Sequence, residues 1–297
     1  MSAPAPHSSS PEAAIIDTCV QKTDALYPAA LKDLQENAPT RLFLRGRAAT
    51  LDVQPRIAIV GTRRATSYGL RVARELATAF ARSGACVVSG LARGIDGAAH
   101  QATLDADGFT IAVLGTGLDH SFPRAHAAMQ SAIGQRGLLI TELEPQFHGE
   151  KFTFPNRNRL IAALTSLTIV VEAPFKSGAI ITADHALELG RTLAAIPGPI
   201  DQPQSAGTNR LIADGAHVIT SPEDALALVG LTHARASRAT PDGDDGLVWR
   251  VLDQGPLDLD ALCHASGLPA TQCLAAVTRL EISGIIECAL TGEIRRR

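Results

Sequence analysis

The chain has 297 residues, of which 45% are hydrophobic, and its formal net charge at pH 7 is −3. This hydrophobic content is that of a globular protein with a substantial core, and it excludes an intrinsically disordered chain. The slightly acidic balance excludes a globally basic nucleic-acid binder but leaves room for a local basic patch.

The cysteine pattern bears on the compartment. Cys19, Cys86, Cys263, Cys273 and Cys288 are odd in number and form no Cys-x-x-Cys pair, which indicates reduced thiols in a cytoplasmic protein. The sequence contains no apolar run long enough for a membrane span and no signal-peptide pattern. The histidines lack metal-ligand spacing, so no metal site is expected.

In chain order, residues 1–40 are predicted to form a disordered tail and a lead-in helix. Short apolar runs then recur at 56–60, 85–89, 110–114, 137–141, 167–171, 192–196 and 217–220. Segments of helical spacing separate these runs, and the first such segment stops at Gly84. Continuous apolar strands alternating with helices indicate a doubly wound, mostly parallel α/β sheet over residues 41–231.

The last part of the chain reads as a separate small domain. A polar linker is predicted at 232–245. Residues 246–297 show amphipathic helices, a turn at 266–269 and a hairpin turning at Thr291 and Gly292, which is typical of a winged helix-turn-helix. Arg279 is the one cation on the expected recognition helix, which is little charge for a helix that reads duplex DNA. A protein-contact or auxiliary role is therefore favoured.

Glycine, hydroxyl and basic residues follow the predicted strands, at the edge where doubly wound sheets bind ligands. Gly61 permits a tight turn after the first strand, and Thr62 with the amides beyond it would face an anion at a helix start. Arg63 and Arg64 stand beside them. Similar loops follow the second and fifth strands, and they contain Gly90, Arg93, Lys176, Ser177 and Gly178.

Residues 151–159, K-F-T-F-P-N-R-N-R, mix aromatic and basic side chains. Asn156 fits a helix N-cap, which would place Arg157 in the first turn, where positive charge is unfavourable unless an anion binds. A phenylalanine is by default a core residue. Arginines beside aromatic faces, however, are the composition that binds single-stranded nucleic acid, whose phosphates pair and whose bases stack.

The loops show no catalytic arrangement. Neither the Gly-x-Gly-x-x-Gly nor the Walker fingerprint of nucleotide-binding proteins is present. Asp96 and His100 are either an acid–base pair or, more often, a helix-start cap and a buried histidine. We predict a binding protein rather than an enzyme, with no catalytic residue, cofactor or metal.

A series of motifs carries a resemblance to a known family: Y-P-A-A-L, I-A-I-V-G-T-R-R-A-T-S-Y-G, V-V-S-G-L-A-R-G-I-D-G-A-A-H, T-I-A-V-L-G-T-G-L-D, F-P-N-R-N-R-L-I-A-A-L, V-V-E-A-P-F-K-S-G-A-I-I-T-A-D-H-A-L-E-L-G-R, I-P-G and G-T-N-R-L-I-A-D-G-A. In this order, over residues 27–216, they resemble the DprA/Smf family (DNA processing protein A). The resemblance implies an extended Rossmann fold that binds single-stranded DNA, protects incoming DNA and loads RecA recombinase during natural transformation. It also implies a homodimer, with the dimer and RecA surface around residues 196–216.

Carried onto this sequence, the resemblance implies a DNA pocket formed by Gly61, Thr62, Arg63, Arg64, Ser89, Gly90, Arg93, Lys151, Phe152, Phe154, Arg157, Asn158, Arg159, Lys176, Ser177 and Gly178. Two alternatives stay open. A nucleotide-processing phosphoribohydrolase shares this architecture, but Ala183 and Asp184 stand where its catalytic glutamate belongs. A transcription factor would bind DNA through the winged helix and use the Rossmann part as a sensor.

Overall fold

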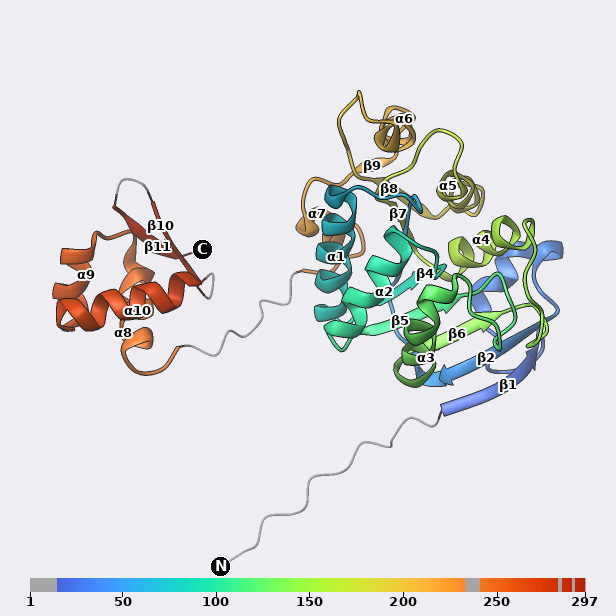
Figure 1. Cartoon of the computed structure of the whole chain (residues 1–297), viewed down its shortest axis with the longest axis horizontal. Helices are drawn as coiled ribbons and strands as arrows, with labels where there is room; N and C mark the ends of the chain where they lie inside the picture. Colours follow the sequence, from blue (N-terminus) through green and yellow to red (C-terminus); the bar gives the residue numbers. More distant parts are fainter. Residues whose placement is uncertain (1–14, 233–240, 283–284, 290–291, 297) are drawn as a thin grey trace, which may run out of the picture. The chain divides into compact units, whose positions relative to one another are not determined.

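The computed structural model describes residues 15–232, 241–282, 285–289 and 292–296. The chain divides into two compact units, Met1–His233 and Ala234–Arg297. A nine-stranded sheet forms the centre of the first unit, in the order β1-β2-β6-β5-β4-β3-β7-β8-β9 (Figure 1).

Seven strands of this sheet run parallel and coincide with the seven predicted apolar runs. They are β3 (Arg56–Val60), β4 (Cys86–Ser89), β5 (Phe109–Val113), β6 (Leu138–Thr141), β7 (Leu167–Val170), β8 (Thr192–Ala195) and β9 (His217–Val218). Residues of β3, β4, β6 and β7 are buried throughout, because helices cover both faces. The predicted doubly wound, mostly parallel α/β fold is confirmed.

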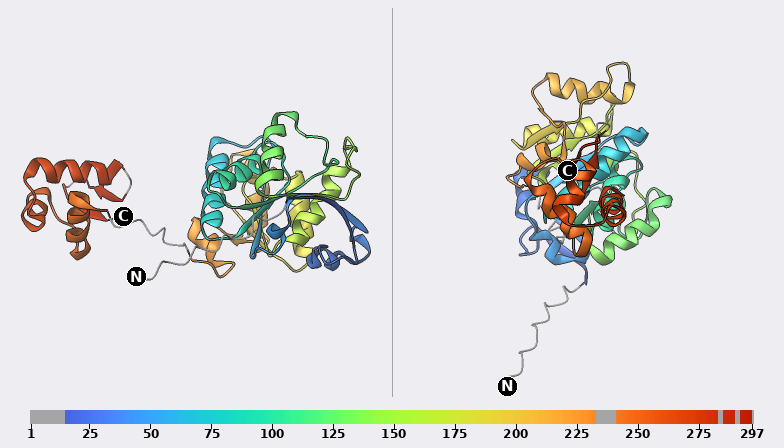
Figure 2. Two further views of the ribbon diagram at one scale, coloured as in Figure 1. Left: turned by 90° about the horizontal axis from the view of Figure 1, so that it is seen from below. Right: turned by 90° about the vertical axis from the view of Figure 1, so that its left-hand side faces the viewer.

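The helical layers separate cleanly by face (Figures 1 and 2). One face is covered by α1 (Ser67–Arg82), α2 (Ile95–Asp105), α3 (Ala127–Arg136) and α7 (Pro222–Ala227). The other is covered by α4 (Thr153–Leu164), α5 (Gly178–Glu188) and α6 (Ala206–Ala213). Helix α1 ends as predicted, since Gly84 adopts a φ of 76°, a conformation that favours glycine.

The start of the first unit differs from the prediction. Residues 15–21, expected in a disordered tail, form the edge strand β1 (Ile15–Gln21), which pairs antiparallel with β2 (Arg41–Arg47), and β2 pairs with β6. Of this strand only Val20 is buried, and Ile15 faces outward, so the apolar alternation that marks a strand is blurred. The lead-in helix is a 3₁₀ segment, η1 (Ala29–Asn37). Residues 1–14 of the predicted tail lie outside the described residues.

The second unit has the winged-helix order. It contains α8 (Gly243–Val251), α9 (Leu259–Ser266), α10 (Ala270–Ile282) and the antiparallel pair β10 (Ile286–Cys288) and β11 (Ile294–Arg296). Helix α8 begins three residues inside the predicted linker, where Asp244 and Asp245 stabilise its first turn through the helix dipole. Most of the linker, and Thr291 of the predicted hairpin turn, lie outside the described residues.

Candidate nucleic-acid interface

The strand order reverses between β3 and β7. A pocket lies at the carboxyl ends of these two strands, where doubly wound folds usually bind their ligands. The pocket has a volume of about 940 Å³ and adjoins a second of about 1190 Å³. Arg63, Phe154 and Arg157 line both pockets. We call the combined surface the switch-point groove; it extends from residues 175–182, across these three residues, to residues 120–124.

The start of α4 fixes the middle of the groove. Helix α4 begins at Thr153, whose hydroxyl donates to the Gly115 carbonyl at 2.6 Å. The predicted N-cap at Asn156 is therefore wrong: Pro155 lies in the first turn, where its missing N–H has no helical acceptor to lose. A Cβ on Gly115 would lie 2.6 Å from the Phe154 ring, so this ring rests directly on the Gly115 backbone.

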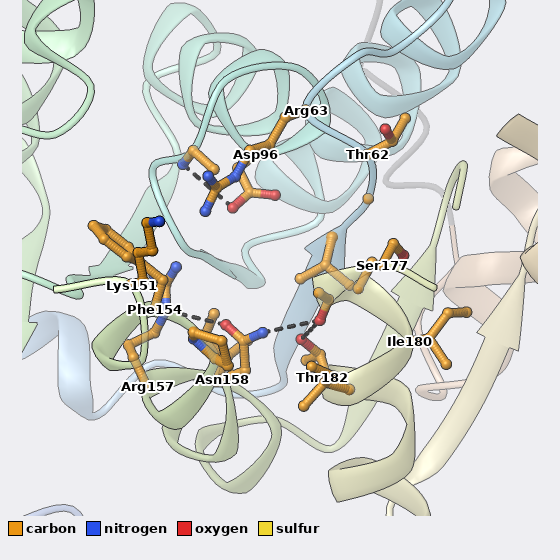
Figure 3. A pocket seen from close by; sticks show the side chains of 18 of the residues that line it. Thr62, Arg63, Asp96, Lys151, Phe154, Arg157, Asn158, Ser177, Ile180 and Thr182 are labelled. Atoms are coloured by element: carbon orange, nitrogen blue, oxygen red, sulfur yellow. Dashed lines mark hydrogen bonds between the residues drawn. The ribbon is translucent and has the colours of Figure 1, made fainter. Parts of the chain in front are cut away.

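Arg157 forms the floor of the groove (Figure 3). Its side chain is buried, with Nη1 donating to the Val113 carbonyl and Nε donating to Asn158 Oδ1 at 3.2 Å. A Cβ on Gly90 would lie 2.4 Å from both Nη atoms, so only glycine leaves room for the guanidinium. Burial lowers the pKa of Arg157 to about 10, against the attraction of Asp96, and the group stays charged at neutral pH.

Asn158 connects two of the elements that surround the groove. Its Nδ2 donates to the Gly178 carbonyl at 2.9 Å, which ties α4 to the start of α5, and Figure 3 shows this contact beside Thr182. Gly178 and Lys176 line the same part of the groove. The structure thus brings the predicted first, fourth and fifth loops together around one cavity.

Positive charge dominates the groove. Among the described lining residues, the cationic side chains are Arg63, Arg64, Arg93, Arg124, Lys151, Arg157 and Lys176, and the acidic ones are Asp96 and Glu150. Asp96 Oδ2 accepts hydrogen bonds from the N–H groups of Gly90 and Ala92 at 3.1 and 3.3 Å, so this oxygen is already hydrogen-bonded within the protein. A chain of net charge −3 therefore concentrates cations at one edge of its sheet.

Aromatic rings alternate with these cations. The Phe122 and Phe154 rings are 4.7 Å apart between centroids, and the Arg63 guanidinium lies 5.6 Å from the Phe154 centroid. Phe175 is 64% exposed at the other end of the groove. Sequence reasoning did not select Phe122, Arg124 or Phe175, although S-F-P-R and F-K-S-G follow strands at the same sheet edge and carried the same signal.

Three predicted pocket residues do not line the groove. Ser89 is fully buried in the sheet, and its hydroxyl donates to the Ile59 carbonyl at 2.7 Å. Phe152 is 58% exposed but lies outside both pockets. Arg159 donates both Nη groups to Glu142 at 2.7 and 2.6 Å, and its Nε donates to the Asn37 carbonyl of the 3₁₀ segment η1, so this side chain points away from the cavity.

Three amides of the glycine-arginine loop, which were predicted to face an anion, are bonded within the protein instead. The Thr62 N–H donates to the Glu172 carbonyl at 2.7 Å, and the Arg64 N–H donates to Thr62 Oγ1 at 3.2 Å. The Thr66 N–H donates to Glu172 Oε2 at 2.9 Å. These three amides are therefore already bonded, and the loop lines the groove with the side chains of Arg63 and Arg64.

Asp96 and His100 take structural roles. His100 is fully buried with Nδ1 2.8 Å from Thr110 Oγ1, and burial, reinforced by the charge of Arg157, lowers its pKa to about 3. The imidazole is thus neutral at physiological pH, which fits the buried-histidine interpretation. Within the described part of the chain, His, Cys, Asp and Glu side chains do not cluster in threes as a metal site requires.

The winged-helix unit holds several of its cations in internal pairs. Arg279 on α10 donates to Asp245 Oδ1 at 2.6 Å, and Arg295 pairs with Glu287. The Arg296 guanidinium lies 3.9 Å from the centroid of the Trp249 ring. The main cation of the expected recognition helix is therefore already neutralised within its own unit. No helix in the described part of the chain combines the length and apolarity of a bilayer span.

Together these features define a Rossmann-type α/β protein with a basic, aromatic-lined groove and a C-terminal winged helix. Comparison with protein-family models identifies the family. The model described as DNA recombination-mediator protein A matches residues 18–230, and the DprA winged helix domain matches residues 232–289. The chain belongs to the DprA/Smf family, as its motifs predicted.

Individual relatives agree. Protein Smf of Escherichia coli is 37% identical over 272 residues, which cover 87% of this chain and 72% of that protein. The crystal structure of DNA processing protein A from Streptococcus pneumoniae has a TM-score of 0.68 and 40% identity, covering 71% of this chain and 74% of its own. A Helicobacter pylori DNA processing protein A structure, described for its single-stranded DNA binding mode, has a TM-score of 0.62 and 31% identity, covering 71% and 92%.

Proposed function

We propose that this chain binds single-stranded DNA in the switch-point groove and has no catalytic activity. The observation that carries the proposal is the alternation of cations with accessible aromatic rings: Arg63 lies against Phe154, Phe154 against Phe122, and Lys176 next to Phe175. Cations that pair with phosphates and rings that stack on bases bind single strands without reading sequence. The Helicobacter pylori relative, described as binding single-stranded DNA, supports the same assignment.

The geometry suggests a path for the strand. A base stacks on Phe175 at one end and another near Phe122 and Phe154, each stack contributing about 1–3 kcal/mol. Phosphates between them pair with Arg63, Arg64 and Lys176, while Arg93 and Arg124 extend the path. Duplex DNA keeps its bases inside the helix and cannot use the rings, so the groove prefers a single strand.

The absence of catalysis is part of this proposal. The rival phosphoribohydrolase needs an acid in the helix after the fifth predicted strand, but within α5 Ala183 is fully buried and Asp184 is exposed outside the pocket lining. Asp96 is held by two backbone amides. Incubation with nucleoside monophosphates, followed by chromatography for the released base, tests this directly. Turnover would favour the enzyme.

Family membership supports a wider role. We propose that the protein acts in the cytoplasm as a homodimer that protects incoming DNA and loads RecA recombinase onto it during natural transformation. The family description as a recombination mediator supports this role. Light scattering tests the dimer. RecA filament formation on single strands precoated with single-strand-binding protein tests loading, and an unchanged rate with the chain present would count against it.

The direct test of binding is fluorescence anisotropy of labelled oligo-dT and of a matched duplex, titrated at several salt concentrations. We expect strong, salt-sensitive binding to oligo-dT and much weaker binding to the duplex. Equal binding to both, lost on removal of the winged-helix unit, would instead support the transcription-factor alternative.

A further inference from the structure

The N-terminus of α1 is already occupied by an anion from the protein itself. Glu172, which follows β7 and is 3% exposed, directs its carboxylate at the residue that caps α1. Its Oε2 accepts the Thr66 N–H at 2.9 Å, and its Oε1 accepts the Thr66 hydroxyl at 2.5 Å. The first turn of α1, Ser-Tyr-Gly-Leu, has no acid in its own sequence, so Glu172 supplies the charge that the helix dipole favours.

Glycines make room for this carboxylate. A Cβ on Gly69 would lie 2.3 Å from Glu172 Oε2 and 2.4 Å from its Cδ. A Cβ on Gly61 would lie 2.5 Å from Ile95 Cγ1 and 2.9 Å from the Glu172 backbone carbonyl oxygen, which accepts the Thr62 N–H. Glycine at position 69 therefore leaves the space that the Glu172 carboxylate occupies, and the Glu172 backbone is bonded to the other end of the loop.

This position matters because of where α1 lies. In doubly wound folds, the helix after the first strand of the switch point binds the phosphates of nucleotides and dinucleotides with its N-terminal amides. Here β3 and β7 flank that point, and the carboxylate of Glu172 fills the place of the phosphate. A phosphate there would meet a buried negative charge and would have to displace it.

The start of α5, on the other side of the groove, is different. Ser177 at its N-cap makes no cap bond, and its buried Oγ has no hydrogen-bond partner among the described residues. Lys176 precedes it on the groove wall. An anion in the groove can therefore bind to the N-terminus of α5, to Lys176 and to the arginine side chains, whereas the carboxylate of Glu172 already occupies the N-terminus of α1.

We propose that Glu172 determines ligand specificity: it closes the nucleotide-phosphate position at α1 and reserves the groove for the diester backbone of a strand held by side chains. This rests on the proposed single-strand binding. It predicts that free nucleotides are poor ligands although the fold is one that commonly binds them.

The experiment compares dTMP and NAD⁺ with unlabelled oligo-dT as competitors of labelled oligo-dT, using the full-length chain. Three variants are needed: Glu172→Ala vacates the position, Glu172→Gln keeps its shape without the charge, and Glu150→Gln removes an exposed groove acid elsewhere as a matched control. Thermal unfolding followed by circular dichroism establishes that each variant is folded.

We expect wild-type protein to bind dTMP and NAD⁺ only weakly. Glu172→Ala should strengthen dTMP binding relative to oligo-dT on the order of tenfold, and Glu172→Gln by a few fold, as a helix-terminus charge interaction allows. Glu150→Gln should strengthen both ligands in parallel, since it removes a general repulsion. The ratio of the two affinities therefore reports on Glu172 alone.

Two results would overturn the proposal. One is submillimolar binding of dTMP or NAD⁺ by wild-type protein, which needs no variant to fold. The other is an unchanged dTMP-to-oligo ratio in a folded Glu172→Gln protein, the variant that preserves packing. Failure of wild-type protein to bind oligo-dT at all would instead contradict the proposed function. Direct binding of dTMP to wild-type and Glu172→Gln protein would then still decide whether Glu172 excludes the nucleotide.

Discussion

Arg63 and Arg159 both stand beside the groove in sequence-based reasoning, but the structure separates their roles. Arg63 is exposed, lines both pockets and lies 5.6 Å from the Phe154 centroid. Arg159 is 19% exposed and donates two hydrogen bonds to Glu142, with Nε donating to the Asn37 carbonyl at 3.1 Å. We therefore predict that Arg63→Ala weakens DNA binding and that Arg159→Ala weakens the fold.

The magnitudes follow from these contacts. Loss of one charge-assisted phosphate contact costs about 1.5–3 kcal/mol, so Arg63→Ala should reduce oligo-dT affinity at least about tenfold. The slope of log K against log salt should become shallower by about 0.7, the value for one single-strand phosphate. Arg159→Ala leaves the partly buried Glu142 without its partner, which should lower the free energy of unfolding by about 2 kcal/mol.

The assays are anisotropy titrations with oligo-dT at several salt concentrations and urea unfolding of each variant. Arg82→Ala, an exposed change in the last turn of α1, serves as the matched control. Arg82→Ala should leave the salt slope unchanged. An Arg63→Ala protein with wild-type affinity and slope, or an Arg159→Ala protein of wild-type stability with a reduced slope, would refute the reasoning.

Three further predictions use other parts of the structure. Phe175→Ala should weaken oligo-dT binding about 5- to 100-fold, whereas Phe152→Ala, at a side chain of similar exposure outside the groove, should bind like wild type in the same titration. Because the pKa of His100 is about 3 in the folded chain against about 6.5 when unfolded, its neutral form stabilises the fold above pH 6.5 and this stability is lost as pH falls toward 3. Urea unfolding should show wild type losing about 2 kcal/mol more between pH 7 and pH 5 than His100→Gln does, and equal losses would contradict this assignment. A chain ending at residue 232 should keep single-strand binding within about twofold, because the groove lies wholly in the first unit; loss of binding on truncation would place the site elsewhere.

The elements predicted most accurately from the sequence are the buried strands. The seven parallel strands are apolar on both faces, so their runs are unambiguous and their carboxyl ends indicate where ligand loops gather. Strand β1 was missed because residue polarity does not follow the alternation of exposure along this edge strand: the apolar Ile15 lies on the outer side and the polar Thr18 on the inner side. The start of α4 was misplaced because Thr153 is held both by Glu150, three residues earlier, and by the distant Gly115 carbonyl, a contact that the local sequence does not reveal.

Tertiary contacts also limited the prediction of the candidate site. The sequence placed Ser89 and Arg159 near the correct edge of the sheet, but the direction in which each side chain points depends on its hydrogen-bond partners. Ser89 donates back into the sheet, and Arg159 faces Glu142, which lies 17 residues earlier in the chain. The role of Glu172 could not be predicted locally either, because the space it occupies is left by Gly69, about a hundred residues earlier.

The central claim is that the switch-point groove, rather than the winged-helix unit, holds the single strand. The measurement that tests it most directly is photocrosslinking of an oligonucleotide containing 4-thiothymidine to the full-length chain, followed by tryptic digestion and mass spectrometry. We predict crosslinks at Phe154 in the peptide of residues 152–157 and at Phe175 in the peptide of residues 160–176. Crosslinks confined to residues 243–296, with neither of these peptides modified, would contradict the claim.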